Sequence, residues 1–514
     1  MKSLTLAALL IGTAVCTAAP PTPTGLAPLA MQRGTTATFD IQGTLGDRPL
    51  EIWCSRPDLT FTVSADKPQL EVTAPAEAPP GLIWIRLHNA EGASEPLPLL
   101  IDTSPQLMEQ EPNNHHREAQ VVDALPRTIQ GVLHKGGEDD TFRVALNSGE
   151  QLIASVAAHE AFNTPADCVV QILSADGFVL AQNDDDHGDD PLLAFTAPLD
   201  GDYFVRVFAF PADPNSTINF AGGADYRYLL TLTTGPYIDA LTTPGGTDKP
   251  IGWNLTEGLD VAATPGWHWL SPTADKATSF GQFADGLWTI EPNQSVTAAV
   301  SAPGSSVTAR LQATKGTSYR FRVAAQELGS QLDPVLNITD AAGAVIKEVD
   351  DKSREVRDVD LISKAPADGE FRLAIADRFG HAGDRYFFQL SVEIESPQVE
   401  LTLAANRFVL KKDAPLEIPV TITRTGGFDQ QIVIQALDLP EGVTSEPVTS
   451  EPKGDSSKSV KLILKADNAA AFNGPIRIAA FPDASAEATP LVIATTNWPI
   501  PRWKSEQVWL TVLQ

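Results

Sequence analysis

The segment EQEPNN combines acidic and amide side chains at a spacing suited to cation binding. Glu109 and Glu111 are two residues apart, so in an extended chain they point to the same side. Pro112 stiffens the chain after them, because its ring fixes the backbone φ angle. Asn113 and Asn114 add neutral side-chain oxygens. The segment therefore offers several oxygen ligands from one short stretch of backbone.

A second acidic segment, GEDDTF, follows in the chain. Gly137 permits a tight turn, and Glu138, Asp139 and Asp140 come directly after it. So many negative charges close together are unfavourable unless a cation compensates them. Ca²⁺ takes about six to eight oxygen ligands in flexible geometry, whereas Mg²⁺ prefers octahedral sites that keep several waters. If the two segments meet, they predict a calcium site; otherwise they form a solvated acidic linker and hairpin.

The densest acidic run is NDDDHGDD, at residues 183–190. It indicates a glycine-containing loop between two strands, with a second cation site as the alternative. The segment EVDDKSREVRD, at residues 348–358, occupies the same place in a repeat described below and contains basic residues as well. We therefore expect that the fold itself does not require acidity there.

The sequence lacks the motifs of common hydrolases. His159 and Glu160 lead into AFN without the second histidine of HExxH, and neither a G-x-S-x-G elbow nor a G-x-x-x-x-G-K-[ST] loop is present. The adjacent His115 and His116 face opposite ways in an extended segment, which disfavours joint zinc ligation. We expect no enzyme activity, although a Ser, His and Asp brought together only by the fold would leave no motif.

The composition is that of an acidic globular protein. Of 514 residues, 43% are apolar and 20% are charged, which allows packed cores. The 65 acidic residues outnumber the 37 basic ones and give a net charge of −28. Such a surface repels phosphate backbones and anionic membranes, so we exclude nucleic acids as partners.

The first residues have the layout of a secretory signal peptide, at residues 1–19. Lys2 provides the positive charge, the apolar stretch over 4–15 is too short to span a bilayer, and small residues follow it. No other stretch has 18 uninterrupted apolar residues, so we expect no transmembrane segment and a secreted or periplasmic chain. Cys54 and Cys168 remain after cleavage, and their apolar neighbours favour two free thiols.

Alternation of apolar and polar residues predicts β-strands along the chain, as in residues 81–89, 141–146, 459–465 and 507–513. Helical periodicity is almost absent, and Gly, Pro and Asn separate the alternating stretches. The expected fold class is all-β. We predict four main β-sandwiches in tandem, Ig-like and jelly-roll-like, together with a connector.

Two parts of the chain repeat the same motifs in the same order. ALNSGEQLIASVAA matches QATKGTSYRFRVAA, FTAPLDGDYFVRV matches SKAPADGEFRLAI, and GGADYRYLLTL matches HAGDRYFFQLSV. We infer two copies of one β-domain. After the signal peptide at 1–19, the expected division is an Ig-like sandwich at 20–104, the first copy at 105–236, a connector or small β module at 237–288, a degenerate second copy at 289–395 and an Ig-like sandwich at 396–514.

Four motifs of the first copy carry a family resemblance. They are EQEPNN, the GEDDTF turn, LDGDYFVRV and the closing DYRYLLTL. With them the chain resembles the bacterial pre-peptidase C-terminal (PPC) domain family. The resemblance implies a jelly-roll-like β-sandwich related to the collagen-binding domains of clostridial collagenases, and a non-catalytic accessory of secreted enzymes, often proteases. It covers residues 105–236 well, residues 289–395 only in their strands, and neither terminal sandwich.

Relatives in this family bind calcium through the acidic EPN segment and the Asp-rich turn. The resemblance therefore implies a calcium site whose ligands are drawn from Glu109, Glu111, Asn113 and Asp140, with Asn114, Glu138 and Asp139 as further candidates. Glu138 stands where Asp is more usual, which changes the reach of that ligand. The second copy keeps EPN at residues 291–293, but its counterpart of the turn, GSSVTA, has no carboxylate. We expect no calcium there.

Two groups of aromatic residues have alternative interpretations. Tyr226 and Tyr228 are two residues apart on the last strand of the first copy and so share one face. Exposed, they would bind a ligand by stacking on a polymer; buried, they would pack into the core or against the next domain. The clustered tryptophans of the connector, and Trp498 and Trp503 around PIPR, are expected at seams between domains.

Together these features predict an exported, multidomain protein that binds rather than catalyses. The expected partner is an extracellular protein or polysaccharide, and the expected role is adhesion or presentation. The alternative is an accessory component of a secreted peptidase, or a hydrolase with no recognisable motif.

Overall fold

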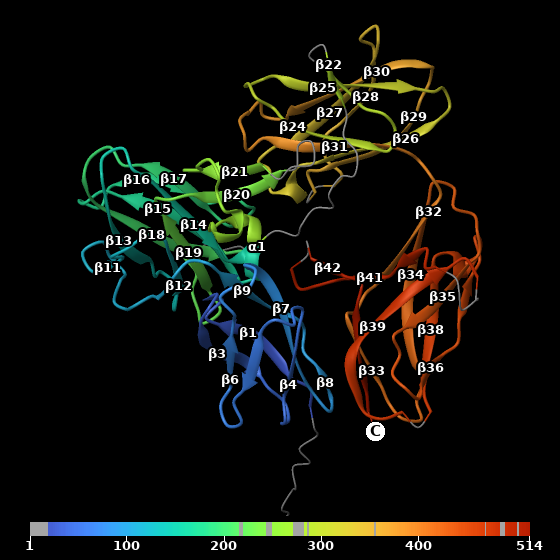
Figure 1. Cartoon of the computed structure of the whole chain (residues 1–514), viewed down its shortest axis with the longest axis horizontal. Coiled ribbons are helices and arrows are strands. Elements are labelled where there is room, and N and C mark those ends of the chain that lie inside the picture. Colours follow the sequence, from blue (N-terminus) through green and yellow to red (C-terminus); the bar gives the residue numbers. More distant parts are fainter. Residues whose placement is uncertain are drawn as a thin grey trace, which may run out of the picture.

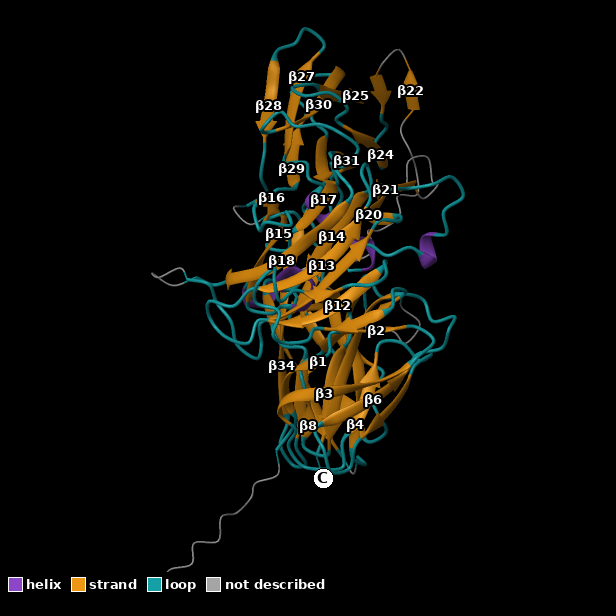
Figure 2. Cartoon of the chain, turned by 90° about the vertical axis from the view of Figure 1, so that its left-hand side faces the viewer, coloured by secondary structure: helices purple, strands orange, loops and turns teal. Residues whose placement is uncertain are grey.

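The protein is built almost entirely from β-strands, as Figure 2 shows. The computed structural model describes residues 19–214, 219–242, 249–270, 282–284, 287–353, 356–467, 469–483, 489–500 and 503–513. In these residues the α-helix is limited to α1 (His159–Phe162). The predicted all-β class is therefore confirmed. The expected signal peptide lies outside the described residues apart from Ala19, and no described helix is long and apolar enough to cross a membrane.

The first sandwich consists of two antiparallel-rich sheets over residues 22–102. One sheet has the order β1 (Thr22–Ala27), β3 (Thr36–Thr44), β6 (Gln69–Thr73), β5 (Thr60–Val63). The other has the order β2 (Ala30–Gln32), β9 (Leu97–Asp102), β7 (Gly81–Asn89), β4 (Glu51–Cys54), with β8 (Gly92–Ala93) paired to β7. Buried Phe39, Leu70 and Ile83 pack between them, because alternate side chains of each strand face inward.

The second sandwich carries the predicted acidic segments. One sheet has the order β10 (Gln106–Met108), β12 (Arg127–Val132), β19 (Arg227–Thr233), β14 (Gln151–Ala157), β17 (Leu192–Thr196). The other has the order β11 (Gln120–Val121), β13 (Asp140–Leu146), β18 (Gly201–Pro211), β15 (Ala166–Leu173), β16 (Val179–Asn183). Phe142, Leu230 and Val205 are fully buried in its core.

The third sandwich repeats this strand order. One sheet has the order β24 (Gln294–Ala299), β31 (Phe387–Ile394), β26 (Ser318–Ala324), β29 (Val359–Lys364). The other has the order β22 (Gln282–Ala284), β23 (Leu287–Thr289), β25 (Ser306–Ala313), β30 (Gly369–Asp377), β27 (Pro334–Asp340), β28 (Val345–Val349). Within the described residues, β10 has no counterpart there. The duplication inferred from the sequence is therefore visible in the strand pairing.

The register of the paired strands corrects one detail of that repeat. In the second sandwich Gln120 pairs with Phe142, and in the third Trp288 pairs with Ala309 at the corresponding place. Glu291 therefore follows β23 as residue 123 follows β11. The EPN at residues 291–293 is not the counterpart of the EPN at residues 111–113, and the expectation that the second copy keeps this motif is wrong. Short sequence motifs matched by letters alone do not fix a strand register.

Between the second and third sandwiches lies a small module. Its strands β20 (Tyr237–Thr242) and β21 (Lys249–Trp253) pair with each other, and two short 3₁₀ segments follow at Val261–Ala263 and Trp267–Trp269. Trp267 is buried against apolar residues of the first and second sandwiches. The predicted seam role of this connector tryptophan is confirmed.

The fourth sandwich occupies residues 398–512. One sheet has the order β36 (Val443–Ser445), β38 (Ser459–Ala466), β34 (Leu416–Thr425), β32 (Gln398–Leu403), β41 (Thr495–Asn497), β42 (Lys504–Ser505). The other has the order β33 (Arg407–Leu410), β43 (Val508–Val512), β39 (Phe472–Phe481), β35 (Ile432–Leu437), β37 (Val448–Ser450), with β40 (Val492–Ile493) paired to β39. Ile434, Leu462 and Leu510 are fully buried in its core.

The fourth sandwich returns to pack against the first (Figure 1). The Arg86 guanidinium donates to Asn406 Oδ1 at 2.9 Å, and the rings of Trp84 and Trp498 meet edge-to-face with centroids 4.5 Å apart. Trp503 contacts Trp84 as well. The seam predicted for the tryptophans around PIPR is confirmed. The chain thus closes a circuit in which its last sandwich contacts its first.

Close packing of a tyrosine on a glycine yields a first prediction. Gly131 of β12 pairs with Tyr228 of β19, and a Cβ atom added at Gly131 would lie 2.0 Å from the Tyr228 ring. Gly131→Ala should therefore lower the free energy of unfolding by about 2 to 3 kcal/mol through overpacking, measured by denaturant titration. Gly223→Ala is the control, because its nearest neighbour, a Tyr226 ring atom, would be 3.6 Å away. Equal stability of the two variants would contradict this.

Candidate acidic site

Two of the predicted acidic residues meet inside the second sandwich. Glu109 follows β10 and Asp140 begins β13, and their carboxyl groups are close enough to interact with each other. The backbone N–H of Val132 donates to Glu109 Oε1 at 2.9 Å, and the Tyr228 hydroxyl donates to Asp140 Oδ2 at 2.6 Å. One oxygen of each carboxyl group is thus held by the sheet that contains β12 and β19.

The other oxygen of each carboxyl group is buried and accepts no hydrogen bond from an N–H or O–H group of another described residue, and the two carboxyl groups are close enough to share a proton. These oxygen atoms are Glu109 Oε2 and Asp140 Oδ1. The side-chain Oδ1 and Nδ2 of the fully buried Asn113 also have no hydrogen-bond partner among the described residues. The backbone carbonyl of Asn113 accepts a hydrogen bond from Thr141 N–H at 2.9 Å, which holds the acidic segment against the start of β13. Buried oxygens normally have partners, so this set fits a hard cation, for which carboxylate and amide oxygens are the preferred ligands.

The remaining predicted ligands face other partners. Glu111 Oε2 accepts from the Asn113 N–H at 3.0 Å and from the Asn114 amide at 2.9 Å, and Glu111 is exposed. Glu138 Oε2 accepts from the Lys135 N–H at 3.1 Å, and Asp139 pairs with Arg206 at 3.4 Å. The structure therefore brings the carboxyl groups of Glu109 and Asp140 together, and holds the backbone of Asn113 beside Thr141. The side chain of Glu138 bonds the backbone of the turn, and the side chain of Asp139 pairs with Arg206.

The electrostatics of the pair reflect burial and like charge. Burial raises the pKa of Glu109 to about 7. Burial, and then the neighbouring Glu109 carboxyl group, raise the pKa of Asp140 to about 9. His134 Nε2 lies 3.5 Å from Glu109 Oε1, but its side chain is 56% exposed. Two carboxyl groups in this state bind either protons or a cation.

Tyr228 is a member of this site that the sequence did not reveal. Its side chain is fully buried, and its hydroxyl bonds Asp140. Tyr226 is half-buried against the same core. Of the two alternatives for this tyrosine pair, the structure shows burial in the core for Tyr228, because Gly131 opens a place for its ring inside the sandwich, and the speculative ligand-stacking role is wrong for that residue.

The third sandwich shows what replaces these residues. By strand register, Val307 corresponds to Asp140, Phe388 to Tyr228, and Ala298 to Gly131. Three polar or small residues of the second sandwich thus become apolar together in the third. Aligning the two copies by register, rather than by motif, is the sequence signal that would have found Tyr228.

The acidic run at residues 183–190 performs two structural tasks. Asp190 is fully buried, and its Oδ2 accepts from the N–H groups of Ala158 and Ala161 at 2.9 and 3.2 Å, around the start of α1. Asp358 does the same in the third sandwich, accepting from Ala325 N–H at 2.7 Å. This acid is therefore part of the fold in both copies, contrary to the expectation that acidity there is not required.

Asp186 and His187 of the same run join the second sandwich to the third. The Arg385 guanidinium, which precedes β31, donates to Asp186 Oδ1 at 3.1 Å and to Asp239 Oδ2 at 2.6 Å. His187 Nε2 lies 2.7 Å from Asp239 Oδ1, and its ring stacks on Trp267 with centroids 4.2 Å apart.

Asp186, His187, Asp239 and Arg385 form one cluster of polar groups. The ligand atoms of Asp186, His187 and Asp239 lie within 4.8 Å of one another, as in a metal site. Here the positive charge comes from Arg385, which also lies over the Trp253 ring at 4.8 Å. Burial alone would raise the pKa of Asp239, but His187 and then Arg385 hold that pKa below its usual value.

Both cysteines are free thiols in the structure, as the sequence indicated. Cys54 is half-buried and Cys168 is buried, and burial raises the pKa of each. The thiols are therefore protonated at neutral pH and are packing groups rather than nucleophiles.

Comparison with known proteins gives limited matches. No family model matches the chain. A segment of 98 residues is 32% identical to a probable subtilase-type serine protease of Deinococcus radiodurans, covering 19% of this chain and 14% of that protein. The chain therefore spans about a seventh of that relative's length.

Two solved structures illustrate the structural matches. The pre-peptidase C-terminal domain of a Bacillus anthracis collagenase is 9% identical, with 20% of this chain and 92% of that domain covered and a TM-score of 0.17. The SGBP-B protein of a Bacteroides ovatus mixed-linkage glucan utilization locus, in complex with a mixed-linkage heptasaccharide, is 11% identical, with coverages of 72% and 76% and a TM-score of 0.14.

The raised pKa values of the acidic pair yield a second prediction. A carboxyl group whose pKa is higher in the folded than in the unfolded chain favours folding at low pH. In calcium-free buffer, the contribution of Asp140 to the free energy of unfolding should therefore fall as pH rises from about 4 to about 9. Asp140→Asn should remove that part of the slope, measured by denaturant titration across this range. The exposed Asp123→Asn is the control; a wild-type slope in Asp140→Asn would refute the assignment.

The ionic cluster at the junction yields a third prediction. Arg385→Met removes the cation from two buried carboxylates, so the free energy of unfolding should fall by about 3 kcal/mol. Arg378→Met is the matched control, because the pair of Arg378 with Asp350 is solvent-exposed and such pairs contribute about 0 to 1 kcal/mol. Calorimetric melting of both variants measures the difference. An Arg385→Met melting profile equal to that of Arg378→Met would show that the cluster does not hold the junction.

Proposed function

We propose that this chain is an exported, non-catalytic binding protein whose second sandwich is a PPC-like domain stabilised by calcium. The observation that carries the cation is the pair of Glu109 and Asp140, whose carboxyl groups face each other and each keep one buried oxygen that accepts no hydrogen bond from another described residue. The binding role is supported by the tandem β-sandwich architecture and by the absence of hydrolase motifs from the sequence. The proposed partner is an extracellular protein or polysaccharide.

Calcium is the proposed cation because of the chemistry and arrangement of the donors. Carboxylate oxygens from Glu109 and Asp140 and the amide oxygen of Asn113 are hard ligands from two separate segments. Such a set suits the variable geometry of Ca²⁺ better than the strict octahedron of Mg²⁺. When bound, the cation would neutralise the pair and tie the segment after β10 to the start of β13.

An accessory role beside a secreted peptidase is the second candidate. It is favoured by the 98-residue match to a subtilase-type protease, which covers 14% of that protein. In that case the same calcium-stabilised sandwich would serve a protease rather than act independently.

Thermal unfolding of the full mature chain tests the cation. Calcium binds the folded pair and not the unfolded chain, so it should stabilise the protein by about 2.7 kcal/mol at 100-fold excess over Kd. Melting in millimolar calcium should therefore occur at a higher temperature than in EDTA. The double variant Glu109→Gln, Asp140→Asn should lose the difference, and Glu291→Gln, an exposed residue of the third sandwich, should retain it. Identical melting in calcium and EDTA, with no heat of calcium binding, would refute the site.

A further inference from the structure

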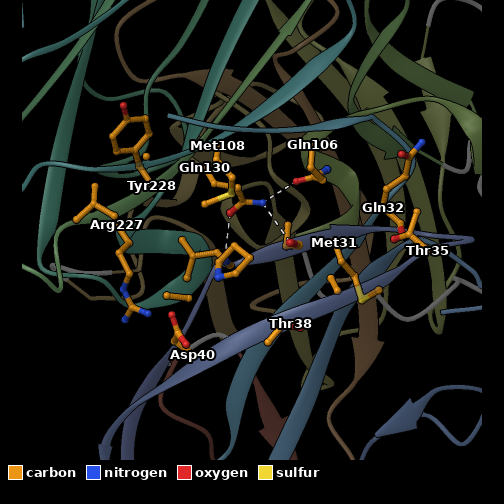
Figure 3. Close-up of a pocket in the computed structure, with 17 residues that line it drawn as sticks. Met31, Gln32, Thr35, Thr38, Asp40, Gln106, Met108, Gln130, Arg227 and Tyr228 are labelled. Carbon is orange, nitrogen blue, oxygen red and sulfur yellow. Dashed lines mark hydrogen bonds between the residues drawn. The ribbon is translucent and has the colours of Figure 1, made fainter. Parts of the chain in front are cut away.

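A cavity of about 590 Å³ lies between the first and second sandwiches (Figure 3). One wall is formed by the segment from β1 to β3, and the other by residues of β10, β12 and β19. Its volume is that of sites that take small organic ligands. Neither the acidic pair nor the junction cluster lines it.

The cavity is held open by hydrogen bonds across the two sandwiches. Gln130 is buried; its Oε1 accepts from Leu29 N–H at 3.0 Å, and its Nε2 donates to Ala30 O at 3.2 Å and to Gln106 Oε1 at 2.6 Å. These bonds, drawn in Figure 3, fix both walls. The cavity is therefore preformed, which lowers the entropy lost when a ligand binds.

Its apolar lining includes two methionines. Met108 lines the cavity from the second sandwich, whereas Met31 on the opposite wall is 1% exposed and packs in the core of the first sandwich. Leu29 and Ala30 also border the cavity, but both are buried in the cluster around Trp267. Methionine is flexible and polarizable, so it adapts to apolar groups of irregular shape. Met108 is 55% exposed and leaves the cavity accessible.

Arg227 provides a buried positive charge on the cavity wall. Arg227 is only 6% exposed. Its Nε has no hydrogen-bond partner, and its guanidinium forms no ion pair with any described residue. One Nη donates to the Leu26 carbonyl, and the guanidinium lies against Gly25. Burial lowers the pKa of Arg227. Asp225 attracts the guanidinium electrostatically but forms no ion pair with it, so an anion in the cavity would compensate the buried charge more directly.

Asp40 also lines the cavity and bears on the choice of ligand. It is exposed, and its Oδ1 accepts from the Gln69 amide at 2.9 Å within its own sheet. Figure 3 draws it on the same side of the view as Arg227. Because exposed charges are screened by water and the buried one is not, Arg227 dominates the attraction of an anion.

We propose that this cavity binds a small organic carboxylate with an apolar body, whose carboxylate pairs with Arg227 while the apolar part contacts Met108. The proposal deepens the binding function above by naming a site and a ligand class, and it does not depend on calcium. The same chemistry is offered by an aliphatic acid and by the carboxyl end of an apolar peptide.

Calorimetric titration of the full mature chain with decanoate and with N-acetyl-leucyl-leucine distinguishes these two sources. At least one should bind saturably with one site, and its amide, which lacks the charge, should bind at least tenfold more weakly. Decylamine is the opposite-charge probe and should not bind. Tighter binding of decylamine, equal binding of the amide, or no binding of either acid would overturn the proposal.

Variants test the residues named. Arg227→Gln should weaken binding of the carboxylate at least tenfold, and Asp40→Asn should strengthen it by about two- to threefold through loss of repulsion. Met108→Glu places a carboxylate on the cavity wall at an exposed position that the fold tolerates, and should weaken binding at least tenfold. Leu199→Glu, at a residue 71% exposed and outside the cavity, is the control and should bind normally. Unchanged binding by Met108→Glu would place the ligand elsewhere.

The two proposals fail separately because each titration is repeated in calcium and in EDTA. Carboxylate binding without a calcium-dependent melting shift would refute the proposed cation site and support the proposed cavity ligand. A calcium-dependent melting shift without carboxylate binding would refute the proposed cavity ligand and support the proposed cation site.

Discussion

An ionised side chain taken out of water loses hydration, and only an opposite charge or a full set of hydrogen bonds offsets that loss. The second sandwich meets this requirement only in part at Glu109 and Asp140. Tyr228 and Val132 satisfy one oxygen of each carboxyl group, and the remaining oxygens are buried. The pair therefore has a high affinity for protons or for a cation.

The same requirement is met differently where sandwiches join. At the junction of the second and third, Arg385 lies between Asp186 and Asp239 and completes the cluster from within the chain. At the junction of the first and second, Arg227 enters from β19 and forms no direct ion pair with a described residue, although Asp225 attracts it electrostatically. The junction of the second and third sandwiches is a closed ionic contact. The junction of the first and second sandwiches has a buried guanidinium on a cavity wall. Because of this difference, the cluster around Arg385 has a structural role, and the cavity beside Arg227 is proposed as a binding site.

The duplication gives an internal comparison for the acidic site. The third sandwich has the same strand order, yet it holds Val307 and Phe388 at the positions of Asp140 and Tyr228. Replacing buried ionic groups by packed apolar ones is often neutral or stabilising. The fold therefore does not need the polar set, and its presence in the second sandwich alone supports a binding role for it.

The sequence by itself determined the strand-rich class, the duplication and the two free thiols, because alternation, turn residues and local apolar runs are short-range patterns. The resemblance to the PPC family implied a larger ligand set that included Glu109 and Asp140. Only the tertiary structure decided which acids meet. In it Tyr228 is buried over Gly131, and Asp139 pairs with Arg206. Arg385 bonds Asp186, which lies 199 residues away in the sequence. Those contacts depend on strand register and on how sheets pack, which local alternation does not specify, since one period-2 pattern is compatible with many registers and many partners.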